Sequence, residues 1–336
     1  MEKVIKIETD TKVLIPYGDS LNSYRKINDA LDFYLEIKEF EKKNKEYLLS
    51  QRLGRFEIFK YSKKAFWDFT KRKINILRTP LLYCRGHVFD YYTYSFVTVP
   101  FPKFFSLNET PKDSFSYIIE NVLPSSEEMV IMEKMNGFLV NISRTFDNEL
   151  LITSSGSLEG PYVEIAKRNL ERFIGKDYEE KLKNIIPKGY TIMTELIAPE
   201  DYFNHIVAKA DQFGFYLLAY SFDYKNKHPK DAKILPFFEE NKLFNNLVDL
   251  GFKKTNFEIK EPDPKNFELE VRKSLEQKDK EGVVIYFLKN NKAFKFLKIK
   301  YKDYLIKKAK KRGYLKKLKY YEELNFEKIK KFFFDI

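Results

Sequence analysis

The sequence contains a single cysteine, Cys84, among 336 residues. One thiol excludes an intramolecular disulfide framework and a cysteine-based zinc site. The three histidines, His87, His205 and His228, are scattered without the spacing of metal ligands. The chain also lacks an apolar run long enough for a transmembrane helix, and residues 1–12 lack the apolar stretch of a signal peptide. These absences predict a soluble, cytoplasmic protein.

Positive charge is abundant and unevenly placed. The formal net charge is +12, and residues 298–336 carry fourteen Lys or Arg against five Asp or Glu. A polyanion is a natural partner for such a segment, because basic side chains release condensed counterions from a phosphate backbone. A solvated lysine-rich tail explains the same composition equally well. Both interpretations stay open at this point.

The order of apolar patterns predicts an α+β fold. Strands and helices are mixed without a βαβ rhythm, which favours antiparallel sheets. Residues 303–333 are helix-prone and basic. We expect an N-terminal extension over residues 1–55, a main domain over 56–302 and a basic helical extension over 303–336. The expected helices are 24–52, 161–174, 232–250 and 265–279, and the expected strands are short segments within 56–105, then 128–134, 138–144, 150–153, 190–198, 213–222, 282–288 and 293–299.

The first candidate for chemistry is Lys134, which ends an apolar strand and begins the segment Lys134-Met135-Asn136-Gly137. A lysine attacks phosphorus only as the neutral amine, so its environment must lower a pKa that is ordinarily near 10.4. The glycine lets the backbone approach a nucleotide closely. Taken alone, this tetrapeptide is a weak signal that arises often by chance, and a β-turn with a surface lysine is the favoured interpretation.

Three further segments carry charge within apolar strands. Glu195 lies in an apolar strand, where a buried carboxylate needs a partner, although a solvent-facing position is the simpler reading. Glu281 and Gly282 open a later strand, and Lys298 and Lys300 share one face of the next. Two convergent ammonium groups suit a nucleotide α-phosphate, although an edge strand with a wet face is also lysine-rich. Chance rarely reproduces all of these in this order.

That order resembles the covalent nucleotidyltransferases, which include ATP-dependent DNA and RNA ligases and mRNA capping enzymes. Residues 84–89 (CRGHVF) and 100–109 (PFPKFFSLNE) are similar to segments of the RNA ligase 1 family of T-even phages. The resemblance runs from about residue 80 to residue 304. It implies a nucleotidyltransferase (adenylyltransferase) fold of antiparallel sheets flanked by helices.

The resemblance also implies roles for individual residues. Lys134 would carry AMP, Arg85 and Lys103 would hold the triphosphate, and Phe105 would help to form the nucleotide pocket. The remaining matched positions are Glu195 for the ribose, Glu281 with Gly282 beside the adenylated lysine and metal, Lys298 and Lys300 for the α-phosphate, and Glu133, Asn136 and Gly137 as further ATP-binding residues.

The chain departs from the family pattern in several places. Ser155 stands in the S-x-G-S segment where the family usually has a basic residue. In the strand 213–222, Phe215, Tyr216 and Tyr220 are alternatives for stacking on adenine. The helix expected at residues 24–52 has no counterpart. The residues after Lys300 are too few for the family's larger helical C-terminal domain or for the OB-fold of DNA ligases and capping enzymes.

The resulting hypothesis is an ATP-dependent RNA ligase that joins 3′-hydroxyl and 5′-phosphate ends through lysyl-AMP and an adenylated RNA end, in RNA repair. ATP and Mg²⁺ are the implied cofactors, with no dedicated metal ligands assigned. RNA is the implied partner, and we expect a monomer in the cytoplasm, that of the host if the chain is viral. A DNA ligase, a capping-type nucleotidyltransferase and a catalytically decayed RNA-binding protein are the alternatives.

Overall fold

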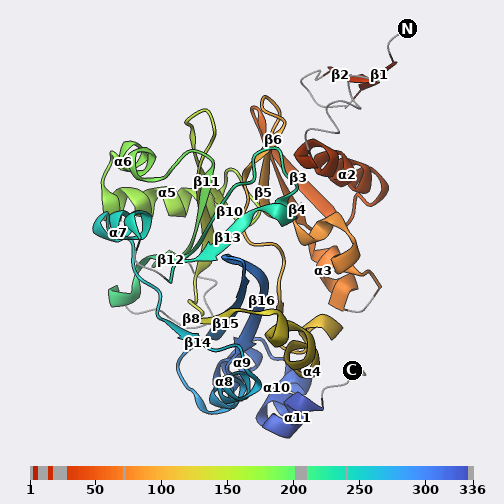
Figure 1. Cartoon of the computed structure of the whole chain (residues 1–336), viewed down its shortest axis with the longest axis vertical. Coiled ribbons are helices and arrows are strands. Elements are labelled where there is room, and N and C mark those ends of the chain that lie inside the picture. Colours follow the sequence, from red (N-terminus) through yellow and green to blue (C-terminus); the bar gives the residue numbers. More distant parts are fainter. Residues whose placement is uncertain are drawn as a thin grey trace.

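The computed structural model describes residues 3–6, 14–17, 29–70, 73–200, 210–238 and 241–331. Three sheets surround the centre of the molecule, and helices cover their outer faces (Figure 1). A separate antiparallel pair, β1 (Lys3–Lys6) and β2 (Leu14–Tyr17), lies near the N-terminus. Strand pairing is antiparallel throughout the described sheets except between β16 and β7. The expected α+β class with antiparallel sheets is confirmed.

The first sheet has the order β3-β4-β5-β6 and is covered by helix α2. In α2 (Asp29–Lys43), Ala30, Phe33, Tyr34 and Ile37 are buried, which is the spacing of one helical face. The other elements of this layer are β3 (Leu48–Leu53), β4 (Phe56–Tyr61), α3 (Lys63–Thr70), β5 (Arg85–Asp90) and β6 (Ser95–Thr98).

The helix expected at residues 24–52 is therefore partly wrong. It ends at Lys43, and residues 48–53 form β3 instead. Residues 24–28 lie outside the described part. The strand forms because a turn at Gly54, with φ of 56°, folds β3 back onto β4 in an antiparallel hairpin. Pairing with the next strand thus overrides the local helical preference.

The second sheet has the order β10-β9-β11-β12-β13. Its members are β9 (Phe138–Arg144), β10 (Leu150–Ser154), β11 (Tyr190–Ile197), β12 (Gly214–Phe222) and β13 (Lys233–Pro236). Three helices pack their apolar sides on one face of it: α5 (Pro161–Ile174), α6 (Tyr178–Ile185) and α7 (Lys242–Asp249). The helix expected at 161–174 is confirmed, with Pro161 in its first turn. The helix expected at 232–250 is wrong over its first part, where β13 adds an edge strand to β12.

The third sheet has the order β14-β8-β15-β16-β7. It comprises β7 (Phe105–Ser106), β8 (Glu128–Glu133), β14 (Phe257–Lys260), β15 (Gly282–Lys289) and β16 (Lys292–Lys300). The expected hairpin of the last two strands is confirmed. The helices beside it are α8 (Pro264–Glu276), α9 (Lys302–Lys311), α10 (Leu315–Glu322) and α11 (Phe326–Lys330).

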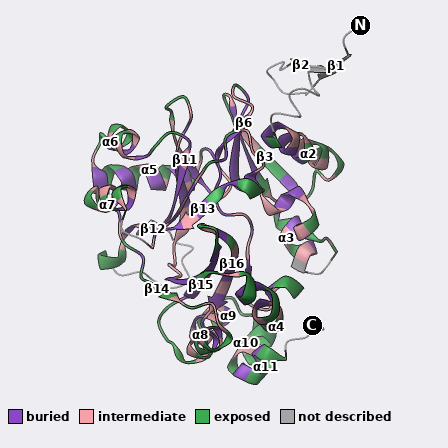
Figure 2. Cartoon of the chain, in the orientation of Figure 1, coloured by how far each residue is buried: buried purple, intermediate pink, exposed green. Residues whose placement is uncertain are grey.

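Short helical turns connect these layers. They are η1 (Ile76–Arg78), η2 (Pro80–Leu82), η3 (Pro111–Asp113), α4 (Phe115–Tyr117), η4 (Ile118–Val122), η5 (Leu123–Ser125), η6 (Ala210–Gln212) and η7 (Pro229–Asp231). Buried residues line the sheets between the helices, whereas α10 has no buried residue (Figure 2). A cluster of Phe101, Met132, Met193, Tyr286 and neighbouring apolar side chains joins the second and third sheets at the centre. Among the described helices, none has the length and apolar character needed to cross a membrane.

Candidate active site

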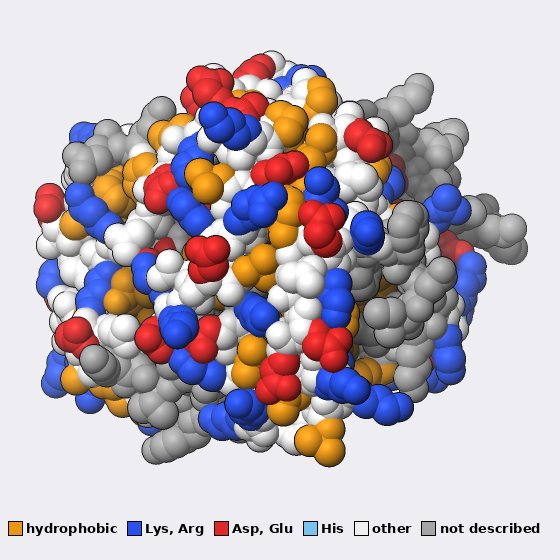
Figure 3. Space-filling model, turned by 90° about the horizontal axis from the view of Figure 1, so that it is seen from below, with side chains coloured by type: hydrophobic (Ala, Val, Ile, Leu, Met, Phe, Trp, Pro, Cys, Tyr) orange, Lys and Arg blue, Asp and Glu red, His pale blue; other side chains and the backbone are white. Residues whose placement is uncertain are grey.

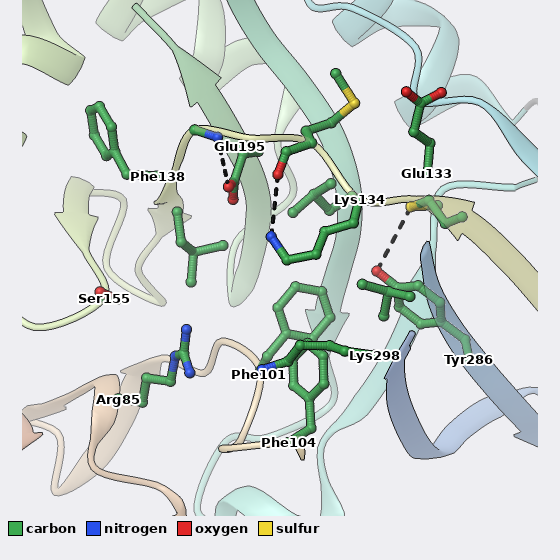
Figure 4. A pocket seen from close by; sticks show the side chains of 16 residues that line it. Arg85, Phe101, Phe104, Glu133, Lys134, Phe138, Ser155, Glu195, Tyr286 and Lys298 are labelled. Atoms are coloured by element: carbon green, nitrogen blue, oxygen red, sulfur yellow. Dashed lines mark hydrogen bonds between the residues drawn. The ribbon is translucent and has the colours of Figure 1, made fainter. Parts of the chain in front are cut away.

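A cavity of about 280 Å³ opens where the three sheets meet (Figure 4). Four aromatic rings line it, from Phe101, Phe104, Phe138 and Tyr286. Its polar lining consists of Arg85, Glu133, Lys134, Ser155, Glu195 and Lys298. An apolar enclosure with a few convergent charged groups is typical of a site for a small ligand.

Lys134 lies directly after β8 and reaches into this cavity (Figure 4). Its backbone N–H donates to the carbonyl of Gly282 at 2.9 Å, which extends the pairing of β8 with β15 by one residue. Its ammonium donates to the carbonyl of Met135 at 3.3 Å and lies 3.0 Å from a carboxylate oxygen of Glu281. The side chain of Lys134 is 21% exposed and that of Glu281 is 6% exposed. The amine is thus held in a fixed position yet remains open to a ligand.

Glu281 joins two of the sequence-predicted lysines. Its second carboxylate oxygen lies 3.9 Å from the ammonium of Lys300, and the Tyr304 hydroxyl hydrogen-bonds to the same carboxylate. Burial lowers the pKa of Lys300, and the nearby charge of Lys134 lowers it further, while Glu281 opposes both effects. Glu281 therefore reduces the repulsion between the ammonium groups of Lys134 and Lys300.

Lys298 enters the cavity from β16, two residues before Lys300, as the strand period predicts. Its ammonium lies 4.5 Å from the centroid of the Phe104 ring. Burial lowers the pKa of Lys298 well below its ordinary value, and the charges of Lys103 and Arg85 lower it further. An anion in the cavity would relieve this accumulation of positive charge.

Lys103 and Arg85 supply two more cations on the same side. Lys103 is 7% exposed, its ammonium lies 4.0 Å from Glu109, and it faces the ring of Phe105 at 4.9 Å. Burial lowers the pKa of Lys103 to about 8, although Glu109 opposes the shift. Arg85, the first residue of β5, lines the cavity itself. Within the described part of the chain, its guanidinium has no ion-pair partner.

Glu195 lies on β11 beside the turn that follows Lys134. It accepts a hydrogen bond from the backbone N–H of Gly137 at 3.1 Å (Figure 4). Burial raises the pKa of Glu195, while the positive charge of Lys134 lowers it. The reading of Glu195 as a simple solvent-facing strand residue is therefore wrong. Asn136 lies in the same turn, and Glu133 pairs with Lys280 at 2.9 Å at the rim.

Phe105 is placed differently from the expectation that it helps to form the pocket. It is 3% exposed and packs into the core of the first layer rather than lining the cavity. Phe101 and Phe104, from the same short segment, line the cavity instead. The segment itself was the correct signal, but its backbone is irregular between β6 and β7, so no strand period assigns its rings to a face.

None of the three adenine-stacking candidates lines the cavity. Phe215 is buried under the helices beside Phe252, and Tyr220 packs against Phe237 with their rings tilted. Tyr216 lies opposite Glu195, and its hydroxyl donates to the Gln212 carbonyl. Leu218 is the residue of β12 that lines the cavity. A bulge at this residue changes which side chains of β12 face inward, and sequence periodicity does not reveal it.

The chain is similar in fold to solved structures of ligases. The chain superimposes on an archaeal ATP-dependent RNA ligase with a TM-score of 0.52 at 13% identity, covering 87% of this chain and 70% of that one. A putative ATP-dependent DNA ligase from Aquifex aeolicus gives 0.49 at 12% identity, over 88% of this chain and 76% of that one. A variant of the Naegleria gruberi RNA ligase with ATP and Mn gives 0.42 at 17% identity, over 65% and 60%. The chain thus spans less than two thirds of the Naegleria protein.

The chain shares the fold of the first of these, the archaeal ATP-dependent RNA ligase. The chain belongs to the RNA ligase family, because the family model described as RNA ligase matches residues 83–306. That range includes every predicted site residue from Arg85 to Lys300. No curated protein matches the chain. The sequence-based assignment to this family is confirmed.

Proposed function

We propose that this chain is an ATP-dependent RNA ligase that works through a covalent lysyl-AMP intermediate. The observation that supports this most directly is the position of Lys134, whose amine enters the cavity beside Glu281 and among Arg85, Lys298 and Lys300. Such a cluster of cations suits a polyphosphate, and the aromatic lining suits a base. Membership of the RNA ligase family also supports this proposal.

In the first step, the Lys134 amine attacks the α-phosphorus of ATP. A phosphorus–nitrogen bond forms, the bond from the α-phosphorus to the oxygen that bridges to the β-phosphate breaks, and pyrophosphate leaves. The ammonium must first lose a proton, and the Glu281 carboxylate at 3.0 Å is in position to accept it. Lys298 and Arg85 stabilise the charge that develops on the phosphate oxygens. Glu195 contacts the ribose, and the turn at Asn136 and Gly137 contacts the nucleotide.

A divalent cation fits this donor set. Within the described residues, no group of three or more His, Cys, Asp or Glu is placed to form a metal cage. Mg²⁺ prefers one or two carboxylates together with phosphates and water, so Glu281 is the residue that would hold it beside ATP. When bound, it neutralises phosphate charge during the transfer.

In the second and third steps, AMP passes from Lys134 to an RNA 5′-phosphate, and a 3′-hydroxyl then displaces it. The basic helices α9, α10 and α11 are the proposed contact surface for RNA. On that lower face, acidic side chains lie between the basic ones (Figure 3). Lys307, for example, is paired with Asp303 at 2.7 Å. We therefore expect distributed contacts with phosphates rather than one basic patch.

We further propose the three-part division of the chain at residues 55 and 302, a monomeric state and a cytoplasmic role in RNA repair. The main part begins with β4, and the last part begins with the helix that carries Tyr304 to Glu281. Residue 55 lies in the turn between the paired strands β3 and β4. The N-terminal part consequently belongs to the same sheet as Arg85.

The testing experiment is incubation of the protein with Mg²⁺ and α-labelled ATP or, separately, GTP, followed by denaturing electrophoresis. Covalent label from ATP that pyrophosphate removes supports the proposal, and the Lys134→Ala variant should take up none. Label from GTP alone would indicate capping chemistry. Label on Lys134→Ala would refute the assignment of the nucleophile. Sealing of RNA and of DNA strands by the labelled protein then separates the two ligase types.

A further inference from the structure

Lys60 on β4 lies directly opposite Arg85 on β5. Residues directly opposite in an antiparallel pair point to the same face of the sheet, so both cations project toward the side where Arg85 lines the cavity. Like charges in this position repel each other. Within the part of the chain that the structure describes, neither side chain forms an ion pair. No carboxylate of the described residues therefore makes a close ion pair with either cation.

The neighbouring loop of residues 154–157 makes room for Lys60. A Cβ atom placed on Gly156 would lie 2.4 Å from Cδ of Lys60, 2.9 Å from its Cγ and 3.1 Å from its Cε. Any side chain at residue 156 would thus displace the lysine. Ser155, one residue earlier, lines the cavity. The side chain of Lys60 consequently passes over Gly156, the residue next to the cavity-lining Ser155.

The outer end of Lys60 is accessible. The residue is exposed, while Ile58, two positions earlier on the same face of β4, is buried against Leu158 just after the loop. Ile58 therefore packs beside the loop, and Lys60, the next residue on the same face of β4, is exposed to solvent. Lys60 therefore lies outside the cavity lining, between the exposed surface and the loop that carries Ser155.

We propose that Lys60, together with Arg85, binds the β- and γ-phosphates of ATP and the pyrophosphate that leaves. This inference rests on the proposed function. The α-phosphate must lie at Lys134, so the rest of the triphosphate is the part of ATP available to cations further along the cavity wall. Two cations on adjacent strands that make no close ion pair within the described residues match two adjacent phosphates. Lys60 lies on the first sheet, before the residues that the family model matches.

The test is the kinetics of lysyl-AMP formation by the Lys60→Met variant, which keeps the unbranched stem of the side chain as far as Cε and removes its charge. We expect the KM for ATP to rise about tenfold with kcat changed little, because one charged contact to the ground-state phosphates is lost. Pyrophosphate should inhibit about tenfold less strongly, whereas AMP, which lacks the outer phosphates, should bind unchanged. Lys60→Arg should restore the wild-type values.

Two further variants keep the result interpretable. Gly156→Ala leaves the charge of Lys60 but displaces its side chain, so it should raise the KM in the same direction. Lys45→Met, at an exposed position before β3, is the control for loss of surface charge and should behave as wild type.

Sealing of pre-adenylated RNA bypasses ATP and should be unchanged in Lys60→Met. A defect confined to that reaction would overturn the proposal and indicate an RNA contact, and a wild-type KM in Lys60→Met would also overturn it. Failure of the wild-type protein to form lysyl-AMP would instead refute the proposed function itself.

Discussion

Lys134 and Glu281 lie far apart in the sequence, yet their charged groups are 3.0 Å apart. The backbone explains this contact. β8 and β15 pair so that Glu133 is opposite Val283. Lys134 follows Glu133 directly, and Glu281 lies two residues before Val283, so both side chains emerge at the same end of this strand pair. A slip of β15 by one residue along β8 would carry Glu281 away from Lys134 and reverse the faces of the β15 side chains. The register of this strand pair therefore fixes the contact between Lys134 and Glu281.

Replacing Glu281 by glutamine should lower the rate of lysyl-AMP formation by about 100-fold or more. The amide keeps the size of the side chain but removes the proton acceptor and the carboxylate available to Mg²⁺. It also leaves Lys134 and Lys300 without their shared counter-charge. Single-turnover labelling with α-labelled ATP is the measurement, and circular dichroism checks that the variant is folded. A folded variant within a few-fold of wild type would contradict this role.

Replacing Gly282 by alanine should destabilise the protein by at least about 2 kcal/mol and slow labelling. The residue has φ of 150°, and an added Cβ would lie 2.1 Å from the carbonyl oxygen of Ile299. Because that oxygen belongs to β16, the strand that carries Lys298 and Lys300 must move. Gly160→Ala is the matched control, since its φ is 120° and its Cβ would contact nothing within 4 Å. Equal losses of denaturation free energy in the two variants would show that backbone strain, not collision, is responsible.

Affinity for ATP should fall as the pH rises through about 8. Burial lowers the pKa of Lys103 to about 8, so its ammonium is charged below this pH and neutral above it. Loss of one charged contact should weaken binding about tenfold between pH 7 and pH 9. Calorimetric titration of ATP into Lys134→Ala measures binding without reaction. Lys103→Arg stays charged and should flatten the dependence, whereas an unchanged slope would exclude Lys103 as its source.

His87 should make the fold sensitive to acid. It is 1% exposed, and burial lowers its pKa from 6.5 to about 3. Between these values the unfolded chain binds a proton that the folded chain does not, so stability falls as the pH drops below about 6.5. The loss from this residue alone between pH 7 and pH 5 is about 2 kcal/mol. Urea denaturation of His87→Phe, whose ring suits the contacts with Tyr83 and Phe96, should show a smaller loss. Parallel curves for both proteins would contradict the assignment.

Local patterns predicted the parts of the fold that depend on local structure. The hairpin of β15 and β16 was evident because β-branched and aromatic residues flank a short polar turn, and α5 because Pro161 begins an amphipathic segment. β3 was mistaken for helix because its strand state depends on β4. β13 was missed because it is a short edge strand that ends in Pro236, an edge-compatible residue.

The charged residues of the candidate site were easier to predict than its apolar wall. Lys134, Glu195 and Lys298 line one cavity, as their motifs implied, because unusual charge within apolar strands is visible in a sequence. The inward-facing rings were not visible in this way. Which side of β12 faces the cavity depends on the bulge at Leu218, and Lys60 belongs to no motif. Such positions follow from three-dimensional packing alone.

The cavity draws its walls from all three sheets. Arg85 comes from the first, Glu195 and Leu218 from the second, and Lys298 and Tyr286 from the third. No single sheet therefore forms the cavity alone, and a ligand bound in it would contact all three sheets. A ligand that binds only the folded protein consequently stabilises the packing of these sheets. The stabilisation is about 2.7 kcal/mol when the ligand concentration is a hundred times its Kd. Release of the ligand removes this stabilisation of the interfaces between the layers.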